Sequence, residues 1–283
     1  MRVLAAHIED VMREAAARWT LLAYFFLSTI FIIIFASAIN LDIVNGTLAG
    51  AKLFGKELNP DSGLSIEKLV LGFEVGFSGF LYIFCTLLAI FATAHLVPRM
   101  QDKGTIDLYL SRPIARVKLL LSRYVAGLIL AMSNVIYLMG TVWVIVVWKT
   151  HVAHPRFLAG AAVIFLVIAV LLAFAFLVGV VTSSTAVSIM MTVGFSIFSS
   201  MLVMHEQFAA AVSKEWQAAL INGMYWVLPK TSELMTAVVA LVGGDEVPDR
   251  LSNALTLSPF LTTAAFGVGC LILASWLFTR KEF

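Results

Sequence analysis

Charged residues are scarce in this chain of 283 residues. Asp, Glu, Lys and Arg make up 13% of it and hydrophobic residues 61%, whereas soluble domains carry roughly 25% charged residues. Mean hydropathy is +0.97. This composition excludes a soluble globular protein, a disordered chain and a collagen-like one. The net charge of +2 gives no field that would recruit nucleic acid, so no nucleic-acid partner is expected.

Cysteine and catalytic patterns are scarce as well. Cys85 and Cys270 each lie inside a long apolar run, which favours buried thiols over a disulfide or zinc site. No Ser-His-Asp, Cys-His or paired-carboxylate pattern is visible, so we expect no catalytic residue and no enzyme activity in this chain. Residues 50–56 have the spacing of a phosphate-binding loop, but Glu57 replaces the Ser or Thr that holds magnesium. We therefore expect no cofactor in this chain.

Long uncharged runs set the fold class, because a helix needs about 20 apolar residues to cross a bilayer. The sequence predicts an all-α integral membrane protein with six transmembrane helices in a single domain, residues 1–283. The spans cover about residues 19–40, 75–96, 124–148, 157–181, 186–204 and 259–279. The first run lacks a cleavage site and is read as a retained span, not a signal peptide. A re-entrant segment, a merged hairpin or an extra short helix would change the count but not the class.

The segments between the spans also carry patterns. In residues 1–18, the apolar and the charged side chains fall on opposite faces of a helix, which predicts an amphipathic interfacial helix. Residues 182–185, all Ser or Thr, predict a turn between spans four and five. The long segment 205–258 contains two candidate helices, the second over 231–242 behind Pro229. We expect both to lie on or in the extracytoplasmic interface.

The distribution of Lys and Arg predicts the orientation. With both termini in the cytoplasm, the inner side holds eleven basic and six acidic residues, a balance of +5. The outer side then holds eight basic and eleven acidic residues, a balance of −3. The positive-inside rule favours this arrangement, in a plasma (inner) membrane.

The loop 97–123 between spans two and three is the most informative stretch. It holds six of the nineteen basic residues and is punctuated by Gly104 and Pro113. Binding to anionic lipid would explain the charge. It would not explain the apolar side chains of Ile106, Leu108 and Leu110, which suit a protein groove better.

The motif in this loop resembles the signature of ABC-2 type permeases. It reads Asp102-Lys103-Gly104-Thr105-Ile106, then Leu108 and Leu110-Ser111-Arg112-Pro113-Ile114-Ala115-Arg116. The likeness extends over the chain, including the basic tail Arg280-Lys281, and is strongest to permeases grouped with sodium efflux, gliding motility and multicopper-enzyme maturation. Met100 and Ala115 depart from the family pattern, which often has glutamate and serine there.

The resemblance implies a transport subunit of an ABC exporter. The loop would form a cytoplasmic coupling helix seated on a separate ATPase subunit, with Asp102, Arg112 and Arg116 making polar contacts. ATP and magnesium would be bound by two such subunits, and this chain would form a homodimer that works by alternating access. Membrane lipids and an extracytoplasmic accessory protein are further expected partners. By the same likeness, spans one, two and five would line an apolar path containing Phe25, Phe77, Phe80 and Phe195.

Two polar features near the outer side have competing readings. Counting back about 20 residues from Leu96 places Glu74 about one turn outside the hydrocarbon, so an interfacial carboxylate is favoured over an outer gate. Gly72, Gly76 and Gly79 form a small-residue pattern that suits local packing or a homodimer seam.

Side chains that could hold copper on the predicted outer side are the imidazoles and thioethers of His151, His154, Met201, Met204 and His205. Their spacing requires no metal, and we predict none.

Three other functions compete with the exporter. Some members of the family transmit force or signals without moving a solute. A stand-alone secondary transporter commonly shows duplicated halves or charges in broken helices, and neither is visible. A membrane enzyme would need clustered polar catalytic residues at one interface.

Overall fold

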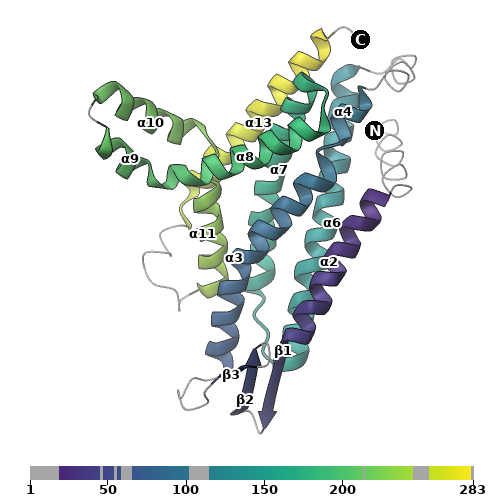
Figure 1. Cartoon of the computed structure of the whole chain (residues 1–283), viewed down its shortest axis with the longest axis vertical. Coiled ribbons are helices and arrows are strands. Elements are labelled where there is room, and N and C mark those ends of the chain that lie inside the picture. Colours follow the sequence, from purple (N-terminus) through teal and green to yellow (C-terminus); the bar gives the residue numbers. More distant parts are fainter. Residues whose placement is uncertain are drawn as a thin grey trace.

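The computed structural model describes residues 19–44, 47–53, 56–58, 66–101, 115–212, 214–244 and 255–281. Long helices dominate this part of the chain and run along its long axis (Figure 1). Five of them are long and apolar enough to cross a membrane, namely Val70–Met100, Arg116–Thr150, Arg156–Thr182, Thr185–Ala211 and Leu257–Arg280. The chain is therefore a multi-pass membrane protein.

The helices follow one another in the order that the apolar runs predict. The first half contains α2 (Trp19–Ala38), α3 (Ile66–Thr93), the short α4 (Leu96–Met100), α6 (Arg116–Thr150) and α7 (Arg156–Thr182). The second half contains α8 (Thr185–Met201), the 3-10 turn η2 (Leu202–Met204), α9 (His205–Ala211), α10 (Glu215–Val227), α11 (Thr231–Gly243) and α13 (Leu257–Arg280). Helices α3, α6, α7 and α13 extend beyond the predicted spans. Residues 1–18, predicted as an interfacial helix, lie outside the described residues.

Helix α6 corrects the predicted coupling loop. Its 35 residues make it about 52 Å long, well beyond a hydrocarbon layer of about 30 Å. Residues 116–123, assigned to the loop because of their charges, form its first two turns. A basic helix end that extends past the membrane cannot be distinguished from a loop by composition alone.

Helix α2 lies against α6 through buried polar contacts. The hydroxyl of Ser28 donates to Asn134 Oδ1 at 3.0 Å, and Lys149 Nζ donates to the carbonyl of Ala36 at 2.6 Å. Residues Leu22–Ser37 form an apolar helix that is shorter than a candidate span. The crossing by α2, the first of the six predicted spans, therefore stays a prediction.

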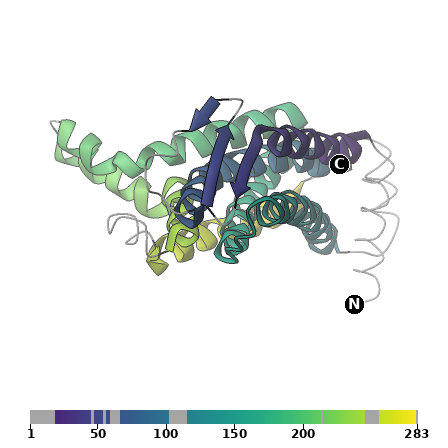
Figure 2. The same ribbon diagram turned by 90° about the horizontal axis from the view of Figure 1, so that it is seen from below.

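A three-stranded antiparallel sheet follows α2 and departs from the predicted all-α class. It consists of β1 (Ile39–Val44), β2 (Thr47–Leu53) and β3 (Lys56–Leu58), with Ile39 opposite Leu53. The sheet lies at the opposite end of the bundle from α4, as Figures 1 and 2 show. The phosphate-loop spacing at 50–56 falls on β2 and β3, so no helix N-terminus follows it to hold a phosphate.

Helix α7 is the centre of the bundle. Its sequence is apolar all round, as expected of a helix buried on every side. Toward the sheet it packs in a core with α3, α6 and α11, and toward α4 in a second core with α4, α6 and α13. Gly267 brings α13 close to Val170 of α7, because a side chain there would meet Val170.

Helix α11 does not lie at the interface as predicted. It packs against α3 and α7 inside the bundle, where Leu234, Ala237 and Val238 are fully buried. By contrast, α9 and α10 have no buried residue and project sideways from the bundle (Figures 1 and 2). The pattern of apolar residues predicted both helical regions but not which of them enters the core.

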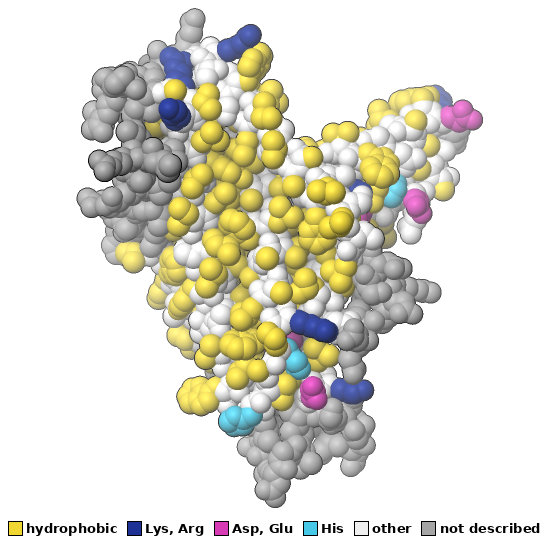
Figure 3. Space-filling model, turned by 180° about the vertical axis from the view of Figure 1, so that it is seen from behind, with side chains coloured by type: hydrophobic (Ala, Val, Ile, Leu, Met, Phe, Trp, Pro, Cys, Tyr) yellow, Lys and Arg dark blue, Asp and Glu magenta, His cyan; other side chains and the backbone are white. Residues whose placement is uncertain are grey.

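The surface matches a membrane protein. On the face in Figure 3, hydrophobic side chains cover the middle of the bundle, and charged side chains and histidines gather near its ends and on the α9–α10 arm. Of the small-residue pattern, Gly79 packs against Met235 and Val239 of α11, whereas a side chain added at Gly72 or Gly76 would meet no atom of the described residues within 4 Å. Local packing is thus observed at Gly79, and a homodimer seam stays a prediction.

The four phenylalanines predicted to line one path fall in separate contacts. Phe77 and Phe80 stack with Phe31, whereas Phe25 lies against Tyr137. Phe195 stacks between two rings from α7 and α13. Within one copy of the chain, the four therefore form no common lining.

Candidate functional site

The predicted coupling motif lies mostly outside the described residues. This is the case for Asp102, Gly104, Thr105, Ile106, Leu108, Leu110, Arg112 and Pro113. Arg116 is described and is the first residue of α6. The structure therefore shows how the two flanks of the motif are held, Gln101 on one side and Arg116 on the other.

The flank before the motif is anchored by packing. Val97 and Met100 of α4 are fully buried in the core that also contains Leu120, Phe176 and Phe278. Pro98 lies close to Gly179 of α7, where an added side chain would meet the proline ring. The chain immediately before segment 102–114 is therefore fixed to the bundle.

Lys281, just beyond α13, gathers three oxygen atoms around its ammonium group. Its Nζ donates to Gln101 Oε1, to the carbonyl of Val180 and to Ser183 Oγ, each at 2.7 Å. Ser183 Oγ in turn donates to Gln101 Oε1 at 3.0 Å, and Gln101 Nε2 donates to the carbonyl of Gly179 at 2.9 Å. Lys281 thus connects the end of α4 to the turn between α7 and α8.

Arg116 attaches the other flank to the same place. Its Nη1 donates to the carbonyl of Lys281 at 2.7 Å and to that of Thr279 at 3.3 Å. We call Gln101, Arg116, Ser183 and Lys281 the clasp. Both flanks of segment 102–114 are tied through it to α7, α8 and α13.

The clasp uses groups that helices leave unpaired at their ends. The carbonyls of Gly179 and Val180 belong to the last turn of α7, and that of Thr279 to the last turn of α13. Such carbonyls have no partner within the helix and form its negative pole, so they favour a cation. Burial lowers the pKa of the Lys281 ammonium below its ordinary value. Ser183 adopts the left-handed conformation, with φ of 51°, which turns the chain from α7 into α8.

Glu74 lies near one end of the candidate span Val70–Met100, and its interfacial position stays a prediction. Only 1% of it is exposed, and its Oε2 lies 2.8 Å from Nδ1 of His154 in the connection between α6 and α7. Among the described residues, its Oε1 has no hydrogen-bond partner. Helix α3 begins about two turns earlier, at Ile66, and the α6–α7 connection reaches the carboxylate through His154.

The histidines considered as metal ligands make other contacts. His154 forms a hydrogen bond with Glu74, and the ring of His205 stacks on that of Tyr225 with the ring centroids 3.7 Å apart. His151 ends α6 in the left-handed conformation. Among the residues that the structure describes, no three His, Cys, Asp or Glu side chains converge as a metal site would require.

The apolar spans and the sequence motif lead to the same family as the comparison with known protein families. Residues 9–283 match the family described as ABC-2 family transporter protein. The chain belongs to this family. No curated protein matches the chain.

Membership of the ABC-2 family identifies the chain as a permease component of an ABC transporter. It also implies association with an ABC ATPase, which this family uses as a partner. The likeness to the sodium-efflux, gliding-motility and multicopper-maturation subgroup stays a prediction.

The sequence predicts only part of these contacts. It marks Lys281 as part of a basic tail and Ser183 as part of the Ser/Thr turn, and it gives no signal for Gln101. Lys230 counts among the eight basic residues of the predicted outer side, yet it is 6% exposed. Its position directly after Pro229, between two apolar helices, was the available signal.

Proposed function

We propose that this chain is the transmembrane subunit of an ABC exporter, and that segment 102–114 is the coupling element that binds a separate ATPase subunit. Two copies of the chain would bind two ATPase subunits, which would bind ATP and magnesium and hydrolyse the ATP. Both termini would lie in the cytoplasm, and the membrane would be the plasma (inner) membrane.

The clasp is the observation that carries this proposal. A coupling element can move transmembrane helices only if it is firmly attached to them. Here Gln101 and Arg116 tie both flanks of segment 102–114 to the ends of α7 and α13 and to the α7–α8 turn. A displacement of the segment would therefore tilt several helices together, as alternating access requires.

The experiment is co-purification with an ATPase subunit whose gene neighbours that of this chain. We expect Arg112→Glu plus Arg116→Glu to abolish assembly, because charge reversal at an interface costs several kcal/mol. The matched control is Lys68→Glu plus Lys214→Glu, which changes the net charge equally on described residues of the predicted outer side. Retention of assembly and of stimulated ATPase activity by the first pair would overturn the coupling assignment.

A second proposal concerns Glu74, which we place at the outer gate. Its carboxylate joins α3 to the α6–α7 connection through His154. Opening of the bundle at the sheet end would therefore either break this contact or move α3 and the connection together. If this is so, loss of the pair changes the rate of substrate movement and leaves assembly with the ATPase intact.

A further inference from the structure

A break between α10 and α11 lies deep inside the bundle. The carbonyl of Thr231 accepts the hydroxyl of Tyr82 at 2.6 Å, and the amide of Lys230 donates to Thr263 Oγ1 at 3.0 Å. Ser199 Oγ donates to the carbonyl of Pro229. Tyr82, Ser199 and Thr263 all belong to candidate membrane spans. Non-helical backbone at membrane depth must be satisfied by protein in this way.

The depth follows from the position of Tyr82 along its helix. It comes twelve residues after the start of the span Val70–Met100, a distance of about 18 Å at 1.5 Å per residue. The break is therefore well removed from that end of the span. Ionisable groups at such depth are costly and mark binding or transport sites.

Lys230 lies in this break and its charge is not neutralised by the described residues. Only 6% of the residue is exposed. Its Nζ lies 4.1 Å from the centre of the Tyr225 ring and 4.7 Å from that of Trp226, but it makes no hydrogen bond or ion pair with the described residues. Ring faces attract a cation only modestly, by about 0.5–2 kcal/mol. A buried ammonium normally needs an anion as well.

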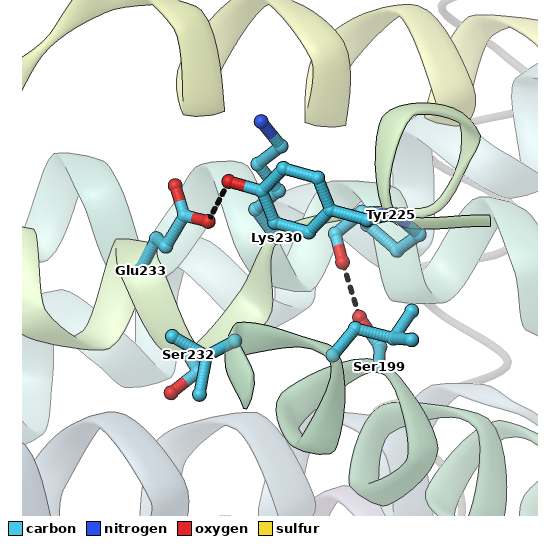
Figure 4. Close-up of a pocket in the computed structure, with 8 residues that line it drawn as sticks. Ser199, Tyr225, Lys230, Ser232 and Glu233 are labelled. Atoms are coloured by element: carbon cyan, nitrogen blue, oxygen red, sulfur yellow. Dashed lines mark hydrogen bonds between the residues drawn. The ribbon is translucent and has the colours of Figure 1, made fainter. Parts of the chain in front are cut away.

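The nearest carboxylate on the lining is already used. Glu233 accepts the hydroxyl of Tyr225 at 2.5 Å, a bond that Figure 4 shows beside Lys230. Lys230 is the only cation among the residues that line the pocket, and it forms no ion pair with Glu233.

A pocket of about 200 Å³ opens beside Lys230. Its lining includes Ser199 and Ser232, which carry hydroxyl groups, and Leu202 and Val203, which are apolar (Figure 4). The pocket is open on one side, so a group that reaches Lys230 can leave the rest of its molecule outside.

The surroundings of the pocket suit an apolar tail. Val203, Trp226 and Val227 are largely exposed, and neither α9 nor α10 has a buried residue. A molecule whose anionic group reaches Lys230 would therefore extend over an apolar surface. Charge and polarity together select an amphiphile, because a fully soluble anion would leave this surface without a partner.

We propose that the pocket beside Lys230 binds the anionic head group, phosphate or carboxylate, of a membrane amphiphile. Lys230 neutralises the charge, Ser199 and Ser232 supply hydroxyls, and the Tyr225 and Trp226 rings hold the ammonium in place. As a statement of the substrate class, the inference rests on the proposed transport function. As a binding site, it stands independently.

The test uses the full-length protein in lipid nanodiscs and the fluorescence of Trp226. Brominated phosphatidylglycerol, which is anionic, is compared with brominated phosphatidylcholine, which is zwitterionic, at the same mole fraction. Trp226→Phe measures the background from the other tryptophans. We expect the anionic lipid to quench Trp226 preferentially, and Lys230→Gln to weaken its binding about tenfold.

The matched control is Lys214→Gln, which removes an exposed lysine at the start of α10 and should keep the preference. Equal quenching by the two lipids in the unmodified protein would overturn the proposal, whether or not the variant folds. So would an equal loss of preference in Lys214→Gln, or none in Lys230→Gln.

ATPase activity of the complex separates the two sources of the amphiphile. If phosphatidylglycerol stimulates the ATPase and Lys230→Gln abolishes this effect, the site binds cargo or a regulator. If the lipid binds without stimulation, the site holds a resident lipid. Failure of the proposed function would instead appear as loss of ATPase assembly, which does not depend on Lys230.

Discussion

Lys281 and Lys230 both lie at helix ends, but their ammonium groups have opposite surroundings. Lys281 donates three hydrogen bonds to three oxygen atoms at the clasp. Lys230, at the head of α11, faces two aromatic rings and donates none to the described residues. The difference separates a lysine that joins helices from one that is available to a ligand.

Glu74 extends this contrast to the sheet end of the bundle. Its Oε1 is buried without a partner among the described residues, whereas Lys281 uses all three of its donors. Buried polar groups without partners are costly and are retained mainly where function requires them. The clasp thus joins helices, whereas Glu74 and Lys230 have groups available to bind or to move.

The largest effect on stability is expected at Glu74. His154→Ala would leave the buried carboxylate without its partner and lower the free energy of unfolding by about 3 kcal/mol. Denaturant unfolding in detergent measures this change. Adding Glu74→Gln should restore part of the loss, because a neutral amide replaces the charge. If the two changes are simply additive, the pair is not coupled.

The two lysines should respond differently to loss of charge. Lys281→Met breaks three hydrogen bonds at a partly exposed site and should destabilise the protein by about 1–2 kcal/mol. Lys230→Met loses two ring contacts but also removes a buried charge, so the net change should stay within about 1 kcal/mol. The same unfolding assay compares them. Equal losses would remove the distinction between the two sites.

The smallest expected effects concern two left-handed residues. His151 and Ser183 have φ of 57° and 51°, a conformation that costs a residue other than glycine about 1 kcal/mol. His151→Gly should therefore stabilise the protein by up to about 1 kcal/mol. Ser183→Gly should gain less, because it also removes the hydrogen bonds to Gln101 and Lys281. Thermal unfolding of the two variants, measured side by side, checks the order.

The sequence predicted the features that depend on local composition. Apolar runs gave the membrane class, and the Ser/Thr cluster gave the turn at Ser183. The sheet was missed although Asn45-Gly46, a strong signal for a hairpin turn, stands between β1 and β2. The start of α6 was misplaced because charged residues can continue a helix beyond the membrane.

The clasp and the Lys230 pocket could not be predicted in the same way. Gln101 and Lys281 lie 180 positions apart, and no local pattern indicates that they meet. The depth of Lys230 depends on α11 entering the core between α3 and α7. Both sites arise from tertiary packing, which the spacing of apolar residues constrains only weakly.

The most direct test of the account is the ATPase activity of the complex with and without the clasp lysine. Lys281→Met should reduce stimulation by at least about fivefold, the lower range of allosteric coupling, and leave the amount of bound ATPase subunit unchanged. Arg280→Met, which removes the neighbouring charge that lies 4.2 Å from the Trp276 ring, should keep the stimulation. Full stimulation with Lys281→Met would contradict the claim that the clasp transmits movement from segment 102–114 to the helices.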